Sequence, residues 1–207
     1  MIAVIDYEIG NLRSVQKALQ RVGGDARLIT TPAELARADK VVLPGVAAFG
    51  DAMEELRSLK LVEPLRKAIA EGMPYLGFCL GLQLLFDVSY EDGEHEGLRV
   101  LPGKVVRFEF AEQQAGGKRL SVPHMGWNQI HTRGECPMLA GIDDGAYVYY
   151  AHSYHVVPDE QAVVATTTDY GHDFVSSVRH ENVFATQFHP EKSQAVGLKL
   201  LENFIRI

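Results

Sequence analysis

The stretch PYLGFCLGLQLLF, residues 74–86, decides the fold. Its first five residues, 74–78, form an apolar run that predicts a buried strand, and the apolar segment after Cys79 predicts a helix. A strand without polar alternation is typical of a parallel sheet that helices cover on both faces. The stretch therefore predicts an α/β fold in which Cys79 occupies the corner between a strand and a helix.

The rest of the first half repeats this alternation of apolar strands and helices. Strands are expected at 2–5, 26–30 and 41–45, and helices at 11–22, from 31 onward, at 51–59 and at 61–70. Gly10 is expected to form the turn before the first helix, and the segment TPAE predicts a capping box with Thr31 as N-cap and Glu34 three residues later. We therefore expect a flavodoxin-like, doubly wound and mostly parallel sheet with helices on both faces.

The second half of the chain, from about residue 103, favours strands. The runs KVVRFEF, YVYYAHSYHV, AVVATTT and VFATQFH have period-two or aromatic patterns, and helical periodicity returns only after Lys192, where Val196, Leu200 and Phe204 share one face. No linker, repeat or low-complexity tract divides the sequence. Residues 1–207 are therefore predicted to be a single domain with a β-rich, partly antiparallel extension.

Composition excludes several classes of protein. The 207 residues are 46% hydrophobic and 23% charged, and the net charge of −7 disfavours binding to nucleic acid. No apolar run reaches the length of a membrane span, and the acidic N-terminus is unlike a signal peptide, so a cytoplasmic location is expected. The two cysteines, Cys79 and Cys136, are expected to be free thiols, and no metal or cofactor is expected.

Cys79 is a candidate nucleophile because of its neighbours. Gly77 and Gly81 stand two residues before and after it, which reproduces with a thiol the G-x-S-x-G turn that exposes a nucleophile. The start of the following helix favours a thiolate, and the amide of Leu80 would face an oxyanion formed during attack on a carbonyl. The alternative is a buried, inert cysteine.

His189 is the best candidate for the base. It ends the run VFATQFHPE, and Glu191 follows two residues later, a spacing that can place imidazole and carboxylate on one side of an extended chain. In a catalytic triad His189 would accept the thiol proton and Glu191 would stabilise the imidazolium. The alternatives are a simple strand end for His189 and a first-turn helix residue for Glu191.

The other histidines and the second cysteine are expected to have no catalytic role. His124 and His152 lie among aromatic and apolar residues and are predicted to be structural, whereas Cys136 is predicted to lie in a surface turn. Polar surroundings predict exposure for His95, His131, His172 and His180.

Several segments together carry a family resemblance. They are GFCLGLQ, HPEKS, DYEIGNLRSV, LPGVAAFGDAM, VPHMGWN, AHSY and GLKLLENF. The combination resembles class I glutamine amidotransferases and, among them, the glutaminase subunits of imidazole glycerol phosphate synthases. The resemblance extends over residues 2–204.

The resemblance implies hydrolysis of L-glutamine to L-glutamate and ammonia through a cysteinyl thioester. Cys79 would be the nucleophile, with His189 and Glu191 completing the triad. The ammonia would be channelled to a separate cyclase subunit in a heterodimer, which makes imidazole glycerol phosphate and aminoimidazole carboxamide ribonucleotide in histidine biosynthesis. Activity without the cyclase is expected to be low.

The resemblance also implies roles for the surrounding residues. The oxyanion would be held by the amide of Leu80 and by backbone at Gly45 and Val46, and Gln83 would contact glutamine unless it is only a polar helix residue. The family has glycine where this chain has Ala47 and Glu8, and alanine raises the free energy of a backbone flip at position 47.

Three residues are expected to face the partner by resemblance: Asn11, Trp127 and Lys192. An exposed lysine is usually only solvated, and a tryptophan can equally belong to the core. Two other functions compete, a glutaminase subunit for anthranilate or pyridoxal phosphate synthesis and a non-catalytic binding module of flavodoxin-like shape. A nucleotide-binding role is disfavoured, because no G-x-G-x-x-G segment or P-loop occurs.

Overall fold

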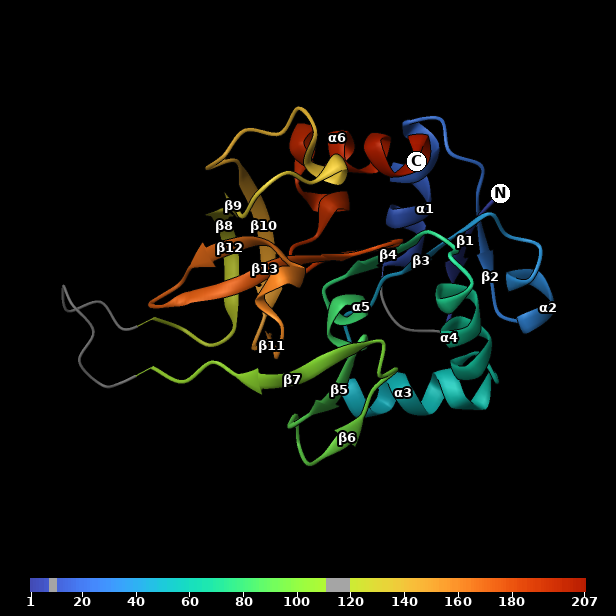
Figure 1. Ribbon diagram of the computed structural model, residues 1–207, viewed down its shortest axis with the longest axis horizontal. Helices are drawn as coiled ribbons and strands as arrows, with labels where there is room; N and C mark the ends of the chain where they lie inside the picture. The colour runs from blue at the N-terminus through green and yellow to red at the C-terminus, as the bar shows by residue number, and fades with distance from the viewer. Residues whose placement is uncertain (8–10, 111–119) are drawn as a thin grey trace.

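The computed structural model describes residues 1–7, 11–110 and 120–207. In that part of the chain an eight-stranded sheet has the order β2-β1-β3-β4-β14-β13-β12-β9 (Figure 1). The strands from β2 to β14 in this order run parallel, and β13, β12 and β9 continue the sheet antiparallel. The bounds are β1 Ile2–Ile5, β2 Ala26–Ile29, β3 Lys40–Leu43, β4 Tyr75–Phe78, β9 His131–Thr132, β12 Val164–Asp169, β13 Asp173–His180 and β14 Val183–Thr186.

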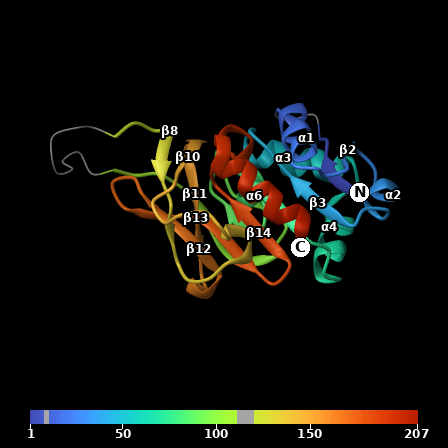
Figure 2. The ribbon, with the colours of Figure 1, turned by 90° about the horizontal axis from the view of Figure 1, so that it is seen from above.

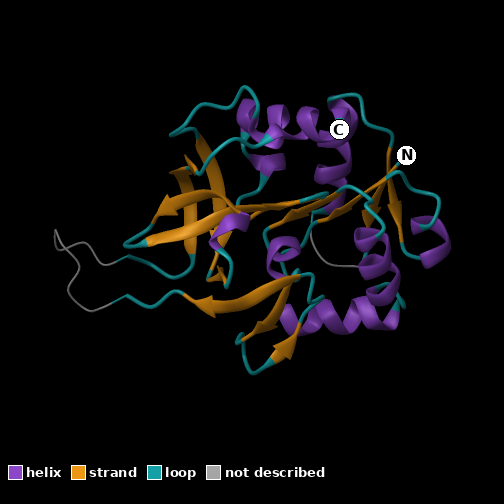
Figure 3. Ribbon diagram, viewed as in Figure 1, coloured by secondary structure: helices purple, strands orange, loops and turns teal. Residues whose placement is uncertain are grey.

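Helices cover both faces of the parallel part of the sheet (Figure 3). On one face lie α1 Leu12–Arg21 and α6 Gln194–Arg206; on the other lie α3 Phe49–Ser58, α4 Val62–Ala70 and the short α5 Leu80–Gln83, with α2 Pro32–Leu35 near the β2 edge (Figure 1).

The side chains of β1 show how the two cores form. Ile2 and Val4 belong to the apolar cluster that contains the α1 and α6 side chains, whereas Ala3 and Ile5 belong to the cluster that contains those of α3 and α4. Because successive side chains of a strand point to opposite faces, one apolar strand supplies both cores. The predicted doubly wound sheet is confirmed.

Within the described residues, two smaller sheets join the β-rich second half to the segment after α5. β10 Tyr147–His152 pairs antiparallel with β8 His124–Gln129, and a four-stranded sheet has the order β11-β7-β5-β6. Its strands are β5 Phe86–Ser89, β6 His95–Glu96, β7 Leu101–Arg107 and β11 Tyr154–Pro158, and the short 3-10 helices are η1 Pro137–Leu139, η2 Gln161–Val163 and η3 Pro190–Lys192. Figure 2 shows the helix-rich part around α1 to α4 at one end of the molecule and β8, β10, β11, β12 and β13 at the other.

The helix predicted after Cys79 is much shorter than its apolar sequence suggested. α5 ends at Gln83, and the apolar residues after it turn into β5, which pairs with β7. The carbonyl of Leu84 accepts a hydrogen bond from the amide of Leu98 at 2.7 Å. Pairing with distant strands overrides the local pattern, because a buried apolar run is compatible with either structure.

Cys136 contradicts the predicted surface turn. Its side chain is buried in the cluster that includes Leu200 and Phe204 of α6, and burial raises the pKa of its thiol. The reason is that η1 packs under α6, where Asn203 Nδ2 donates to the carbonyls of Met138 at 3.0 Å and Ala140 at 2.9 Å. Both cysteines of the chain are free and buried.

The local signals at the helix ends agree with the sequence. Thr31 and Glu34 form the predicted capping box at the start of α2. α1 begins after Asn11, whereas the predicted turn at Gly10, like Glu8, lies outside the described residues. The described helices include none that is both long and apolar enough to cross a membrane.

Candidate active site

The corner between β4 and α5 holds Cys79 in a conformation that L-residues rarely adopt. Its backbone angles are φ 51° and ψ −101°, a strained geometry that is typical of nucleophile turns. The flanking glycines are required sterically. A Cβ on Gly77 would lie 2.5 Å from the carbonyl oxygen of Gly81, and one on Gly81 would lie 1.8 Å from that of Leu43. The close approach of α5 to β3 and β4 therefore depends on both glycines.

Cys79 lies beside the end of β14. Its backbone amide donates to the carbonyl of Thr186 at 2.7 Å, and the residue is only 6% exposed. Sγ lies 3.6 Å from Gln187 Nε2 and 3.9 Å from the carbonyl oxygen of Ala151. The sulfur thus lies between a hydrogen-bond donor and an acceptor.

His189 and Glu191 form a buried pair next to this sulfur. Nδ1 of His189 lies 2.9 Å from Oε1 of Glu191, and the side chains are 3% and 4% exposed. Since a carboxylate accepts, Nδ1 carries the proton, and Nε2 is left as the basic nitrogen. Among the described residues, neither Nε2 nor Glu191 Oε2 has a hydrogen-bond partner.

Electrostatics couples the three predicted triad residues. Burial lowers the pKa of His189, but the Cys79 sulfur and the Glu191 carboxylate outweigh burial and raise this pKa above its usual value. The structure therefore brings Cys79, His189 and Glu191 together, and the arrangement favours transfer of the thiol proton to the imidazole.

A cavity of about 330 Å³ opens beside Cys79. Leu80, Gln83 and Glu91 also line it. Burial raises the pKa of Glu91, whose Oε2 accepts from the amide of Phe49 at 2.8 Å. A small polar substrate can thus meet the thiol, an amide side chain and a carboxylate in one cavity.

The predicted oxyanion site is closed in this structure. The amide of Leu80 donates a long hydrogen bond of 3.4 Å to the carbonyl of Gly45, so the predicted donor already has an acceptor. The turn at residues 44–46 is fixed by Tyr7, whose hydroxyl donates to the carbonyl of Pro44 at 2.6 Å. Val46 of the same turn is 55% exposed. An oxyanion would have to displace the Gly45 carbonyl.

The histidines other than His189 lie largely as predicted. His124 and His152 are buried and hydrogen-bonded to one another, with 3.0 Å between Nδ1 and Nε2, and burial lowers their pKa values to about 4 and about 3. His155, which sequence reasoning passed over, is also buried, and burial lowers its pKa to about 4. Of the four expected to be exposed, His131, His172 and His180 are exposed and His95 is half-buried.

Two of the predicted partner-facing residues lie together on the surface. Trp127 is 47% exposed and its ring meets that of Tyr149 edge-on at 6.0 Å, and Lys192 Nζ lies 5.7 Å from the centre of the same ring. Asn11 is exposed just before α1, a helix that contacts η3, the segment that contains Lys192.

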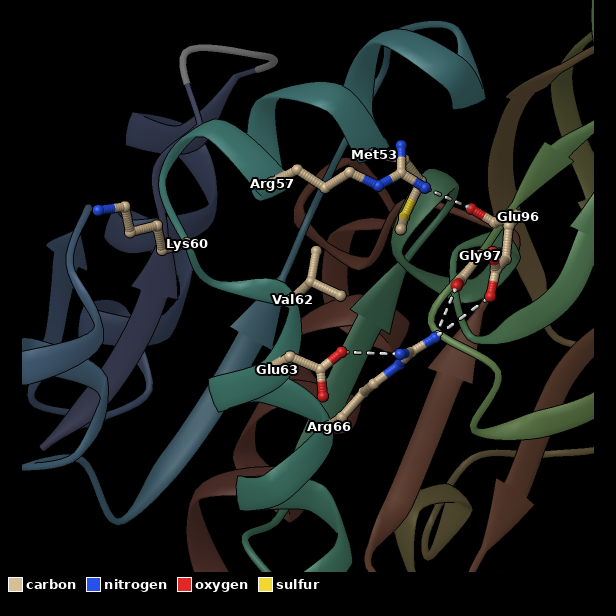
Figure 4. A pocket seen from close by; sticks show the side chains of 8 residues that line it. All are labelled: Met53, Arg57, Lys60, Val62, Glu63, Arg66, Glu96 and Gly97. Carbon is tan, nitrogen blue, oxygen red and sulfur yellow. Dashed lines mark hydrogen bonds and ion pairs between the residues drawn. The ribbon is translucent and has the colours of Figure 1, made fainter.

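A second cavity, of about 380 Å³, lies between α3, α4 and the end of β6 with the loop that follows it (Figure 4). Arg57 Nη2 donates to the carbonyl of Glu96 at 3.3 Å. Arg66 donates through Nε to the carbonyl of Leu98 at 2.6 Å and through Nη2 to that of Gly97 at 3.3 Å. Because these donors already bind backbone carbonyls, we interpret this region as a link between the helices and the loop.

Sequence reasoning missed Gln187 and Tyr7 at the site. Gln187 is fully buried against the Cys79 sulfur, and Tyr7 holds the turn at Pro44. A signal existed for Gln187 in the sequence, because it stands two residues before His189 in the run VFATQFH and alternate residues of a predicted strand point to one side. No comparable signal marked Tyr7.

Known proteins resemble this chain over nearly its whole length. The family model "Glutamine amidotransferase class-I" matches residues 3–207. The imidazole glycerol phosphate synthase subunit HisH of Syntrophotalea carbinolica is 54% identical over 204 residues, covering 99% of this chain and 98% of that protein. The subunit of the same name from Aquifex aeolicus is 52% identical and covers 98% and 95%.

Solved structures of more distant proteins share the fold. PurLQS from Thermotoga maritima has a TM-score of 0.73 at 18% identity and covers 99% of this chain and 97% of that chain. A putative GMP synthase protein from Thermoplasma acidophilum has a TM-score of 0.70 at 22% identity, with coverage of 99% and 92%.

Proposed function

We propose that this chain, which belongs to the class-I glutamine amidotransferase family, is the glutaminase subunit of an imidazole glycerol phosphate synthase. Relatives that are about 50% identical over nearly their full length bear that subunit's name. Their names support a role in imidazole glycerol phosphate synthesis over one in anthranilate or pyridoxal phosphate synthesis. For the reaction itself, the observation that carries the proposal is the buried His189–Glu191 pair beside Cys79. A non-catalytic binding module has no need of this pair.

The first half-reaction is acyl transfer to sulfur. The S–H bond of Cys79 breaks as its proton passes to Nε2 of His189, and Sγ forms a bond to the amide carbon of glutamine. The tetrahedral intermediate then collapses. Its C–N bond breaks, and His189 returns the proton to the leaving nitrogen, so that ammonia departs and a glutamyl thioester remains.

The second half-reaction restores the thiol. Water adds to the thioester carbonyl while Nε2 of His189 accepts its proton, and the C–S bond then breaks. The proton passes to the sulfur, and glutamate leaves. Glu191 holds the imidazole in one tautomer and stabilises the imidazolium in both halves.

Binding of glutamine is proposed to use the cavity beside Cys79. The carboxylate of Glu91 offers a counter-charge for the α-ammonium group, and the amide of Gln83 offers a polar contact. The oxyanion is proposed to be held by the amide of Leu80 together with backbone at Gly45 and Val46. That assignment requires the Gly45 carbonyl to move away from Leu80, and Ala47 makes such a rearrangement less favourable than glycine would.

A cyclase subunit is the proposed partner, and the surface beside the cavity supports this. Val46 and Met125 line the cavity and are 55% and 64% exposed. Trp127 lies two residues after Met125 and so points to the same side of β8. Tyr149 of β10 pairs with Trp127 and, with Lys192 over its ring, extends this surface. An exposed patch of aromatic and apolar side chains is typical of an interface.

Ammonia chemistry gives a reason for such a partner. Free ammonia is mostly protonated at neutral pH and is then not nucleophilic, so a shielded path from Cys79 to a second active site is required.

Asn11 remains a proposed partner contact. The single domain over 1–207 and the cytoplasmic location stay predictions.

The test is glutamine hydrolysis by the purified chain with and without a candidate cyclase and its nucleotide-like substrate. We expect activity to rise sharply in the full mixture. In the same complex Cys79→Ala should abolish hydrolysis but leave ammonia-dependent synthesis intact. Equal turnover with and without the cyclase would reject the coupling, and undiminished hydrolysis by the variant would reject Cys79.

A further inference from the structure

Gln187 connects the proposed nucleophile to the wall of the substrate cavity. It follows β14 and is fully buried. Its Nε2 lies 3.6 Å from Sγ of Cys79, and its Oε1 lies 3.2 Å from Nε2 of Gln83. The amide therefore has one end on the sulfur and the other on a residue that lines the cavity.

Neighbouring groups determine which end of the Gln187 amide faces the sulfur. Gln83 Nε2 lies 3.1 Å from the carbonyl oxygen of Tyr154, and a carbonyl can only accept, so this atom of Gln83 must be the nitrogen. Its other hydrogen then requires an acceptor at 3.2 Å, which must be the oxygen of Gln187. The NH₂ group of Gln187 is thereby left against Sγ.

The Tyr154 carbonyl that starts this sequence of bonds is itself held in place. His152 Nδ1 lies 2.8 Å from the same oxygen and must donate to it. Nε2 of His152 then accepts from Nδ1 of His124 at 3.0 Å. Because burial lowers the pKa of His152 to about 3, the ring stays neutral near pH 7 with its proton on Nδ1.

The Gln187 donor affects the two states of the sulfur differently. A neutral thiol can donate to the Ala151 carbonyl, 3.9 Å away, and gains little from an N–H group. A thiolate cannot donate but accepts strongly, and a charge-assisted hydrogen bond is strengthened in a buried site. The Gln187 amide therefore stabilises the thiolate of Cys79 more than the neutral thiol.

We propose that Gln187 is a further catalytic residue, whose amide donates to Sγ of Cys79 and stabilises the thiolate formed when the proton moves to His189, and that Gln83 sets the orientation of this amide. The inference rests on the proposed function, since it takes Cys79 as the nucleophile. It adds a second task for Gln83, which orients the donor as well as lining the cavity.

The test measures the pH dependence of Cys79 alkylation by iodoacetamide, read on the Cys79 peptide by mass spectrometry so that Cys136 does not interfere. Gln187→Met removes the donor at similar length, and Gln187→Glu keeps an acceptor for Gln83 but places a carboxylate against the sulfur. Gln16→Met is the control, because Gln16 is a half-buried glutamine of α1 whose Nε2 donates to the carbonyl of Ala26 at 3.1 Å.

We expect the alkylation midpoint to rise by about one to two pH units in Gln187→Met and at least as far in Gln187→Glu, because a hydrogen bond to a charged group is lost. Glutaminase turnover at pH 7 should fall about tenfold or more in both, while Gln16→Met should match the parent. A purely structural role would lower melting temperature without moving the midpoint.

An unchanged midpoint in either Gln187 variant that still unfolds cooperatively would overturn the inference. A different result would reject Cys79 as the nucleophile. If Cys79 of the parent protein is not alkylated and the glutamine analogue diazo-oxo-norleucine also leaves it unmodified, the proposed function fails first.

Discussion

Glu191 Oε1 accepts the Nδ1 proton of His189 at 2.9 Å in a region where both side chains are almost completely buried. This one bond assigns the histidine tautomer and leaves Nε2 for the thiol. Glu191→Gln should reverse the assignment, because an amide N–H facing Nδ1 forces the ring proton to Nε2. We expect glutaminase kcat to fall by about 10²–10⁴ with little change in stability.

Steady-state glutamine hydrolysis measures this effect, with Glu63→Gln as the matched control, since Glu63 pairs with Arg66 on the surface. A Glu191→Gln variant with parental kcat would show that the tautomer is set by another group.

Glu91 should determine how tightly glutamine binds. Glu91→Gln removes the carboxylate that we place opposite the α-ammonium group, so KM for glutamine should rise about tenfold or more with a smaller change in kcat. Initial rates over a range of glutamine concentrations separate the two constants. Glu94→Gln, in the exposed part of the same loop, should leave KM unchanged; an equal rise in both variants would remove Glu91 from the binding site.

Gly81 should tolerate no side chain. A Cβ there would lie 1.8 Å from the Leu43 carbonyl, so Gly81→Ala should lower the free energy of unfolding by about 3 kcal/mol or more. At Gly72 no atom of the described residues lies within 4 Å of an added Cβ, and the φ of +92° is what opposes alanine, so Gly72→Ala should lower the free energy of unfolding by about 1 kcal/mol. Urea unfolding of both variants separates steric overlap from backbone strain, and similar losses would contradict the close packing of α5 on β3.

Trp127 should contribute to cyclase binding and to activation, but not to folding. Trp127→Ala should raise the Kd for the cyclase about tenfold or more, because large exposed aromatic residues dominate interface energies. Titration calorimetry measures the Kd. Ile207→Ala is the control, because Ile207 is similarly exposed at the C-terminus, away from β8 (Figure 1). Unaltered affinity in Trp127→Ala would place the interface elsewhere.

His155 should make the protein less stable in mild acid. Burial lowers its pKa to about 4, whereas the unfolded chain binds the same proton at about 6.5. The unfolded state therefore binds more protons between these values, and the stability that His155 contributes is complete above pH 6.5 and is lost as the pH falls toward 4.

His155→Phe removes this contribution and keeps the ring that stacks on Phe108 at 4.6 Å. Urea unfolding at pH 7.5 and pH 4.5 gives the free energy of unfolding at each pH. Between the two, this free energy should fall by about 1–2 kcal/mol less in the variant than in the parent. The exposed His180 provides the comparison as His180→Phe, which should follow the parent. Equal losses in the parent and His155→Phe would contradict a neutral, buried His155.

Much of the fold followed from short-range patterns. The apolar strand 74–78, the helical periodicities and the Thr31–Glu34 capping box each depend on the identities of a few successive residues. The turn at Cys79 carries such a signal at Gly77, because an added Cβ there would meet the carbonyl of Gly81, four residues later; Gly81 itself is required by the carbonyl of Leu43 in the neighbouring strand β3. The short-range signals are readable in the sequence because contacts within a few residues impose them.

Only the tertiary structure decided which distant groups meet. The parallel pairing of β14 with β4 places His189, Glu191 and Gln187 beside Cys79, and pairing of β5 with β7 ends the helix that the apolar sequence predicted. Packing of η1 under α6 buries Cys136, which the local sequence assigned to the surface.

The closed contact between the Leu80 amide and the Gly45 carbonyl was equally beyond reach of the sequence. It depends on how two turns at the ends of β3 and β4 face one another, and composition or spacing does not encode that. Thus the sequence by itself determined which residues have the required chemistry and the local turn that presents the thiol. Long-range packing decided their partners, orientations and protonation, because those depend on contacts between segments far apart in the chain.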